Sequence, residues 1–411
     1  MKSFQKKVFL AAGAYTVSMG SGRNEFNPKK PRPGLDHYIH EAGRAALAQL
    51  SAPQDVDEGV ISNFMAARFN KQGNLASLMT SIHPSLEGRP TVRVEGACGS
   101  GGLGVATGIK SVLSGLADSV LVVGVEVQNT VKAVYGADIL AGAGYYAGER
   151  KEGAAYFFPS KFSDRAGAYF AKYGKEQARE AMASWYAQAV ENARVNPLAQ
   201  EHHNTAKDLM ALGRTPPDAR GFTEHLNGFD CSKVSDGAAA IVVCSEEGLK
   251  KLGVARADAV EVLGLGQCVA NLMAPPADLT SLDTSRKAAS EALAMARIGV
   301  ADAGIFEVHD CFTISGLLSV EALGLAKPGG APELVLSGQT RRGGTHPTNT
   351  GGGLVGYGHP TGASGVRMAV DLWKQLTGKA GPIQVALKKE HGVMISMGGN
   401  DKTVVSVAVR R

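Results

Sequence analysis

Apolar and polar residues alternate between strand-like and helix-like patterns in the first third of the chain. Short apolar runs at residues 8–14, 59–66, 91–94 and 119–125 predict strands. Apolar residues at helical spacing over residues 37–50 predict a helix between the first two runs. Strands that alternate with helices typically form a sheet covered on both faces, so we expect an α/β fold with parallel strands.

The pattern changes from about residue 128 to residue 224. This region is rich in aromatic and basic residues and contains one clear helical pattern, over residues 175–194, which ends at Asn196-Pro197. We expect an insertion placed over the sheet. A plain helical subdomain and a lid that shapes a substrate pocket are both compatible with this composition.

The α/β pattern then resumes and repeats the first half. We expect a helix over residues 285–295 and strands at 236–244, 259–268, 305–308, 383–387, 393–396 and 403–409. Cys98 is followed by Gly101 and Gly104, a helix and a strand; His359 is followed by Gly362 and Gly365, a helix and the strand at 383–387. Two similar halves suggest a pseudo-twofold molecule with one site between them.

Cys98 lies in a glycine-rich turn between the strand at 91–94 and the helix that follows. Free N–H groups and the positive end of a helix dipole favour the thiolate, the nucleophilic form of cysteine. Glycines also let a substrate approach the backbone closely. Taken alone, the turn favours a buried, inert cysteine, and the other motifs reverse that interpretation.

Composition narrows the function classes. A net charge of +5, dispersed over 411 residues, does not favour nucleic-acid binding, although it suits an anionic small molecule. Five widely spaced cysteines without a Cys-x-x-Cys motif argue against a disulfide framework or a zinc site and favour a reducing, cytoplasmic location. We interpret residues 8–14 as a strand rather than a signal peptide and expect no membrane span.

Three stretches carry candidate chemistry: the Cys98 turn, His309-Asp310-Cys311-Phe312 at a strand end, and residues 351–365 around His359. Together they offer a nucleophile, a base, a donor for an oxyanion and a second acid/base. Each stretch is a weak indication alone, and the three in this order are a strong one.

On these motifs the sequence resembles the thiolase superfamily over nearly its full length. The Cys98 turn matches the nucleophile motif, residues 352–365 match the Gly-His-Pro-x-Gly motif, and His309–Phe312 replaces the usual Asn-Glu-Ala-Phe as in sterol-carrier-protein-type thiolases. The resemblance implies duplicated βαβαβαββ halves that form a five-layered α-β-α-β-α core with a large inserted loop domain. The implied division is an N-terminal half at 1–127 completed by 225–254, an insertion at 128–224, and a C-terminal half at 255–411.

The resemblance also implies site residues. Cys98 would attack an acyl-CoA thioester, His359 would activate it, and His309 would help to form, through water, an oxyanion hole for the enolate of a second acyl-CoA. Most thiolases use a cysteine of a C-terminal Cys-x-Gly motif as the second acid/base, but Ser396 stands there. A serine hydroxyl is a poor acid/base near neutral pH, so the role is assigned to Cys311.

The implied activity is that of an acetyl-CoA acetyltransferase-like thiolase, which joins two acyl-CoAs or cleaves a 3-oxoacyl-CoA. Coenzyme A would be a co-substrate, with no covalently bound cofactor and no metal. Arg150, Lys161 and Arg165 are candidate ligands of its phosphates. His346 either lines the pocket or closes a turn.

Two alternatives stay open. One is a condensing enzyme of the 3-oxoacyl synthase kind, which shares the fold and a Cys/His/His set. The other is a thiolase subunit that works with a small OB-fold, zinc-ribbon partner on a specialised acyl acceptor. The resemblance also implies a homodimer or tetramer.

Overall fold

The computed structural model describes residues 4–150 and 155–411. Its strands are β1 (Val8–Tyr15), β2 (Glu58–Ser62), β3 (Thr91–Val94), β4 (Ser119–Val127), β5 (Asp236–Ser245), β6 (Val260–Val269), β7 (Ala303–Glu307), β8 (His391–Gly398) and β9 (Thr403–Arg410). Its longer helices are α1 (Leu35–Leu47), α4 (Ser100–Ser114), α5 (Ala133–Leu140), α7 (Phe157–Tyr173), α8 (Lys175–Val195), α11 (Asp283–Ala296), α12 (Thr313–Leu323) and α15 (Thr361–Thr377). The shorter helices are α2 (Ala66–Phe69), α3 (Leu75–Leu78), α6 (Tyr146–Glu149), α9 (Leu209–Gly213), α10 (Glu246–Lys251), α13 (Ala331–Leu336) and α14 (Gly353–Tyr357).

The strands of the described residues belong to one sheet of order β3-β2-β4-β5-β1-β6-β9-β8-β7, whose two halves meet where β1 pairs with β6. Strands are parallel only toward the two edges, in β3-β2-β4 and β8-β7, and antiparallel between them. The expected parallel sheet is therefore wrong, and the sheet is mixed. Between β8 and β9 the chain reverses in a short turn where Gly399, Asn400 and Asp401 all have positive φ, which makes these neighbours antiparallel.

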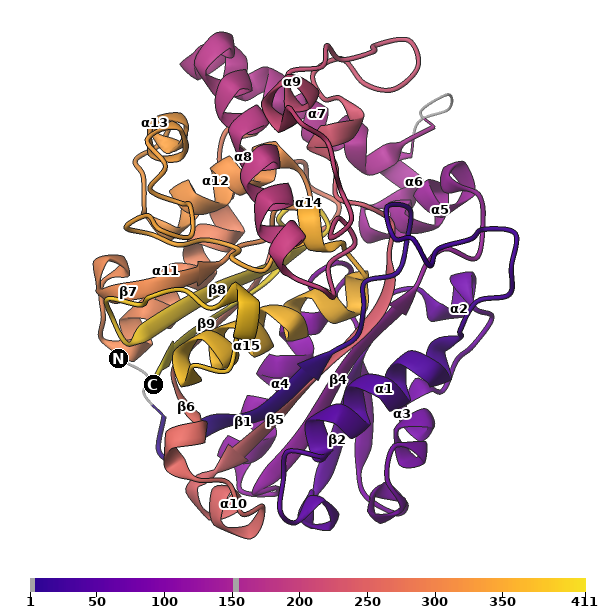
Figure 1. Cartoon of the computed structure of the whole chain (residues 1–411), viewed down its shortest axis with the longest axis vertical. Helices are drawn as coiled ribbons and strands as arrows, with labels where there is room; N and C mark the ends of the chain where they lie inside the picture. Colours follow the sequence, from indigo (N-terminus) through magenta and orange to yellow (C-terminus); the bar gives the residue numbers. More distant parts are fainter. Residues whose placement is uncertain (1–3, 151–154) are drawn as a thin grey trace.

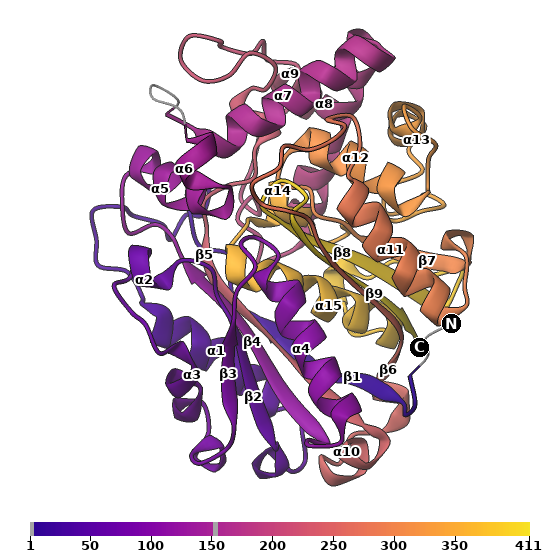
Figure 2. The same cartoon turned by 180° about the vertical axis from the view of Figure 1, so that it is seen from behind.

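The helices form alternate layers with the two halves of the sheet. Helices α4 and α15 pack against each other between the halves, α1 covers the outer face of the first half, and α11 covers that of the second (Figures 1 and 2). A Cβ on Gly101 of α4 would lie only 2.6 Å from the backbone N of Gly365 in α15. Glycine at this crossing lets the first turns of both helices approach closely.

One predicted strand is wrong. Residues 383–387 begin in the 3-10 turn Gly381–Ile383, which contains Pro382, and belong to no strand of the sheet. The other strand and helix predictions are confirmed to within a few residues.

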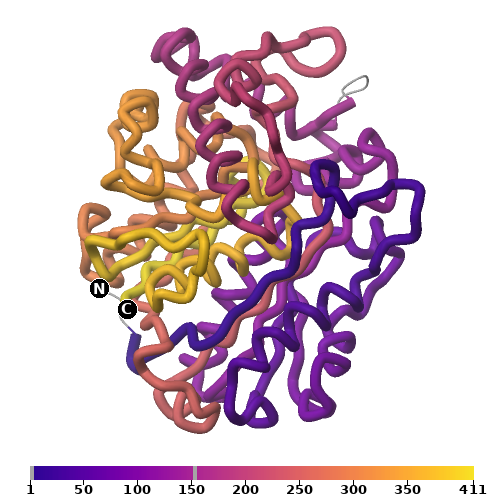
Figure 3. Tube along the Cα trace, viewed as in Figure 1, coloured from indigo at the N-terminus to yellow at the C-terminus, as the bar shows by residue number. Residues whose placement is uncertain are grey.

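The insertion forms helices α5 to α9, which gather over one end of the sheet (Figures 1 and 3). Helix α8 is largely buried and ends at Val195, with Asn196 as its C-cap before Pro197, as the sequence predicts. No helix among the described residues is long and apolar enough to cross a membrane.

Candidate active site

A pocket of about 170 Å³ lies between the insertion and the two halves of the sheet. Its walls include Cys98 from the turn before α4, His309 and Cys311 from the loop after β7, and His359 just before α15. We call it the Cys98 pocket. The four residues predicted to carry the chemistry thus line one cavity, although they come from distant parts of the chain.

The turn that presents Cys98 is held by its neighbours. Ala97 adopts a positive φ of 55°, uncommon for a residue with a side chain, and Gly99 caps α4. The Ser100 hydroxyl donates to the Ala97 carbonyl at 2.6 Å and accepts from the Gly96 N–H at 3.0 Å. These contacts stabilise the sharp turn that leaves Cys98 partly exposed in the pocket.

The sulfur of Cys98 and one ring nitrogen each of His309 and His359 lie within 4.8 Å of one another. The two imidazole rings meet edge to face, with centroids 5.1 Å apart and planes inclined by 83°. In both rings the Nε2 atom is buried without a hydrogen-bond partner among the described residues, whereas Nδ1 is bonded to the protein. Each ring therefore keeps one nitrogen free for the pocket.

Hydrogen bonds assign a tautomer to His359. Its Nδ1 lies 2.7 Å from the Ser364 hydroxyl, which in turn donates to the Pro360 carbonyl at 3.1 Å. Since that hydroxyl proton is committed to Pro360, Nδ1 carries a hydrogen and donates to Ser364. The free Nε2 of His359 then presents a lone pair, which can accept a proton from the Cys98 thiol.

His309 has the opposite tautomer. Its Nδ1 accepts from the backbone N–H of Met397 at 3.3 Å, so the free Nε2 carries the hydrogen. The three clustered atoms are also spaced closely enough to surround a metal ion. Metal-bound histidine normally donates through its other nitrogen, whereas this Nδ1 accepts. The arrangement therefore favours a hydrogen-bond donor at His309 over a metal ligand.

All three groups are neutral at rest. Burial, followed by the nearby Glu126 carboxylate, raises the pKa of Cys98 to about 12. Burial, with a contribution from the Arg367 charge, lowers the pKa of His309 to about 3, and burial also lowers that of His359 well below its ordinary value. The expected stabilisation of a Cys98 thiolate by the helix is thus outweighed by lost hydration. The proton has to leave as the sulfur attacks.

Cys311 is buried beside this cluster. Its sulfur lies 3.9 Å from the Ser315 hydroxyl, which donates to the His309 carbonyl at 2.6 Å. Burial and the neighbouring Cys98 sulfur raise the pKa of its thiol. Ser396, by contrast, is fully buried against Gly102 and Gly365 at the α4–α15 crossing, and its neighbour Met397 lines the pocket instead.

Two buried carboxylates support the site and were missed by the sequence analysis. Glu126 accepts from the backbone N–H groups of Phe64 and Gly362 at 2.9 and 3.0 Å, and so joins the two halves behind His359. Asp310 accepts from Trp185 of α8 at 3.0 Å, and burial raises its pKa to about 6. The position of Glu126, an acidic residue at the end of the apolar strand β4, could have indicated its role from the sequence. No residue near Asp310 in the sequence indicated its contact with Trp185.

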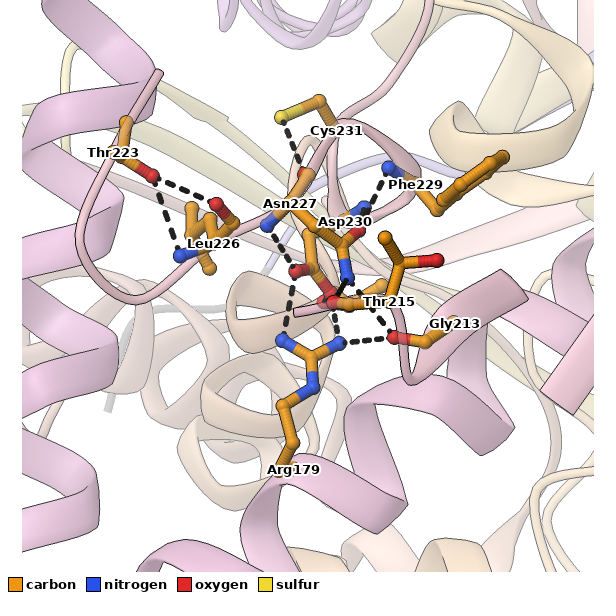
Figure 4. Close-up of polar contacts among 10 residues, drawn as sticks. Arg179, Gly213, Thr215, Thr223, Leu226, Asn227, Phe229, Asp230 and Cys231 are labelled. Atoms are coloured by element: carbon orange, nitrogen blue, oxygen red, sulfur yellow. Dashed lines mark hydrogen bonds and ion pairs between the residues drawn. The ribbon is translucent and has the colours of Figure 1, made fainter. Parts of the chain in front are cut away.

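A second buried network fixes the wall opposite α15. Arg179 of α8 forms two hydrogen bonds to the fully buried Asp230, which also accepts from the Thr313 hydroxyl at 2.6 Å (Figure 4). Asn227 caps the same turn through the backbone N–H groups of residues 229 and 230. The backbone N–H of Ser232 then donates to the Cys311 carbonyl at 2.9 Å. Arg179 therefore ties the insertion to the segment that carries Cys311.

The basic residues proposed to bind phosphate lie outside the pocket lining. Arg150 pairs with Asp138 and Lys161 with Glu149. Arg165 is 1% exposed and donates to Asn400, Leu279 and Ser281, so it links loops and is a wrong choice as a phosphate ligand. The basic residue that lines the pocket is Lys233, which the sequence did not single out.

His346 also lies outside the pocket lining. Its backbone N–H donates to the Gln339 carbonyl and its ring contacts Phe306. The sequence left two roles open for His346, lining the pocket or closing a turn, and these contacts correspond to the second.

Known protein families match both halves of the chain. Residues 35–207 match the family "Thiolase, N-terminal domain" and residues 267–409 match "Thiolase C-terminal domain-like". An acetyl-CoA acetyltransferase of Methanothermobacter thermautotrophicus is 34% identical over 368 residues, which cover 89% of this chain and 91% of that protein. The chain belongs to the thiolase family.

As a thiolase-family member, the protein is an acyltransferase of the thiolase type, as the three motifs predict. A benzoylsuccinyl-CoA thiolase subunit of Thauera aromatica is another relative of this thiolase, 30% identical over 393 residues, or 93% of this chain and 92% of that one. The solved structure of an "Ltp2-ChsH2(DUF35) aldolase" has the same fold, with a TM-score of 0.77, 20% identity and coverage of 98% and 97% of the two chains.

Proposed function

We propose that Cys98 is the nucleophile of this thiolase and carries the acyl group between two half-reactions. The observation that supports this role is the grouping of its sulfur with two imidazole nitrogens of complementary tautomer. The sulfur attacks the thioester carbon of an acyl-CoA while Nε2 of His359 takes the thiol proton. That proton then passes to the departing CoA sulfur, and a Cys98 thioester remains.

In the second half-reaction Cys311 first gives its thiol proton to Nε2 of His359, and the resulting thiolate removes an α-proton from a second acyl-CoA. The Nε2–H of His309 donates to the enolate oxygen that forms, which is where a pre-positioned donor is most effective. The enolate carbon bonds to the acyl carbon, and the Cys98 sulfur leaves and takes the proton back from His359, which restores the resting thiol. The reverse sequence cleaves a 3-oxoacyl-CoA with CoA as the co-substrate.

Coenzyme A thioesters are the proposed donors because the names of both relatives contain a CoA ester. The two names contain different acyl groups, so the relatives do not determine which acyl group this protein transfers. Lys233, on the rim of the pocket beside the 42%-exposed Val234, is the proposed contact for the negatively charged end of CoA.

The test is intact-mass measurement after incubation with acetyl-CoA and longer acyl-CoAs. We expect the mass of one acyl group per chain, released by hydroxylamine, and none in Cys98→Ala. Acylation of Cys98→Ala at the same extent would refute the assignment. Cys244→Ala is the matched control, because Cys244 is buried in β5 and does not line the pocket.

We also propose that the protein works as a cytoplasmic oligomer, with a second protein as an additional subunit. The word "subunit" in the name of the Thauera relative supports a partner, as does the DUF35 protein named in the solved aldolase complex. The half-exposed edge strand β3 offers a surface for self-association. The division at residues 127, 224 and 254 remains our proposed domain boundary. Mass photometry of the chain alone and after co-expression with a candidate partner tests both proposals.

A further inference from the structure

One wall of the Cys98 pocket is formed by two helix stripes from the insertion. Helix α5 contributes Ala137 and Leu140, and the start of α7 contributes Phe158 and Phe162, three or four residues apart and therefore on one face of each helix. Phe312, next to Cys311, stacks on Phe162 with ring centroids 4.5 Å apart. Every residue that these two helices place in the pocket lining is apolar.

The size of the cavity limits what can fill it. Its volume of about 170 Å³ is close to the roughly 150 Å³ of an apolar protein cavity known to admit benzene. An acetyl group on Cys98 would leave most of this space without contacts, and unfilled apolar space forfeits dispersion energy. A planar ring in this space has three aromatic side chains beside it, Phe158, Phe162 and Phe312, and aromatic pairs gain energy beyond the area that they bury.

The arm of CoA that carries the thioester is poorly suited to contact the apolar side chains of α5 and α7. It carries two amides, and amides buried without hydrogen bonds are destabilising. The polar lining that suits such an arm lies on a different segment, at Ser232 and Lys233. The apolar wall of α5 and α7 is therefore left for the acyl group.

We infer that the acyl group carried by Cys98 contains an aromatic ring, as in phenylacetyl or benzoyl. We also infer that the small side chain of Ala137 leaves the space that this ring occupies. This inference rests on the proposed acyl-Cys98 intermediate. The transfer forms the bond between the Cys98 sulfur and the acyl carbon and breaks the bond from that carbon to the CoA sulfur, which receives the thiol proton through His359. No further reactant is needed.

The test compares kcat/KM for CoA release from phenylacetyl-CoA, hexanoyl-CoA and acetyl-CoA, with the Cys98 adduct verified by mass. We expect phenylacetyl-CoA to exceed both others by at least about tenfold, the scale on which apolar pockets discriminate between acyl groups. Equal or higher values with acetyl-CoA or hexanoyl-CoA would overturn the inference while leaving the acyl-Cys98 mechanism intact. Absence of any adduct with every donor would overturn both.

Substitutions on α5 locate the ring. Ala137→Leu should lower the ratio of phenylacetyl to acetyl transfer at least about tenfold, and the milder Ala137→Val should lower it less. Val134→Leu is the matched control, since Val134 is on the same helix, 41% exposed and outside the pocket lining, and should leave the ratio unchanged. A ratio that is the same in Ala137→Leu, Ala137→Val and the unaltered protein would place the acyl group elsewhere.

Discussion

The hydroxyl of Ser364 lies 2.7 Å from Nδ1 of His359 and donates its own hydrogen to the carbonyl of Pro360. Nδ1 of His359 therefore donates to Ser364, on the side away from the pocket. The other nitrogen, Nε2, keeps a lone pair that is free to accept the proton of Cys98. Because burial keeps both the thiol and the imidazole neutral, the correct tautomer matters more here than a permanent thiolate–imidazolium pair would.

Replacing Ser364 with alanine should slow acylation of Cys98. Without its acceptor, the imidazole no longer favours the tautomer with a bare Nε2, so we expect about a tenfold lower rate constant with KM little changed. Single-turnover acylation measured by quenched intact mass checks this. Ser319→Ala is the control, because the Ser319 hydroxyl is buried with no hydrogen-bond partner among the described residues. An unchanged rate in Ser364→Ala would refute the tautomer argument.

Replacing Cys311 with alanine should separate the two half-reactions. The proposed base for the α-proton disappears, whereas Cys98, His359 and the acylation step remain. We expect hydrogen–deuterium exchange at the α-carbon of acyl-CoA to fall by at least about a hundredfold, with acylation reduced far less. Nuclear magnetic resonance of the recovered acyl-CoA measures the exchange. Exchange retained in Cys311→Ala but lost in Ser396→Ala would move the role to Ser396.

Replacing His309 should change how stability depends on pH. Its pKa is about 3 in the folded protein and near the ordinary 6.5 when unfolded, so the unfolded chain binds the extra proton between these values. This contribution to stability is complete above about pH 6.5 and is lost as the pH falls toward 3. In His309→Gln, the free energy of unfolding should fall less steeply on acidification, by roughly 1 kcal/mol per pH unit.

Urea unfolding of both proteins between about pH 4 and pH 7 measures the two slopes. The other titrating groups are common to both proteins, and His359 is the one whose pKa the substitution also changes, because a charged His309 lowers it. Parallel slopes would contradict burial of a neutral His309.

Removing the carboxylate of Asp230 should destabilise the protein strongly. Asp230 is fully buried and Arg179 is mostly so, and Asp230→Ala removes the carboxylate that accepts from Thr313 and balances the charge of Arg179, which keeps its bond to the Gly213 carbonyl. We expect a loss of about 3 kcal/mol in the free energy of unfolding. The matched control is Glu180→Ala, which breaks the solvent-exposed pair with Arg214 and should cost less than about 1 kcal/mol. Similar losses of unfolding free energy in the two variants would show that the buried network contributes no more to stability than the exposed ion pair.

The motifs around Cys98, His309 and His359 were predictable because each depends on local sequence: a turn, a strand end and a helix start. The duplication of the two halves predicted that Cys98 and His359 share one site, and the resemblance to thiolases added His309 to it. The strand at 383–387 was mispredicted because Ile383 and Val385 are apolar and buried although they do not belong to the sheet. Apolar residues at alternate positions were therefore taken for a strand.

Contacts between distant segments could not be predicted from one sequence. The packing of Trp185 on Asp310 and the burial of Arg165 both depend on where the insertion folds. For the same reason the sequence did not reveal that Arg165, a candidate phosphate ligand, lies buried in α7. The raised pKa of Cys98 could not be predicted either, because a helix start is visible in the sequence and the loss of water around a sulfur is not.

The close crossing of α4 and α15 at Gly101 and Gly365 has a consequence for biosynthesis. Positions 98 and 359 are separated by most of the polypeptide, so a ribosome exposes the thiol long before the imidazole that deprotonates it. Until the later helix docks, the growing chain holds this sulfur without the imidazole that the folded site places beside it. Chemical competence therefore arrives in a single late step, together with completion of the folded core.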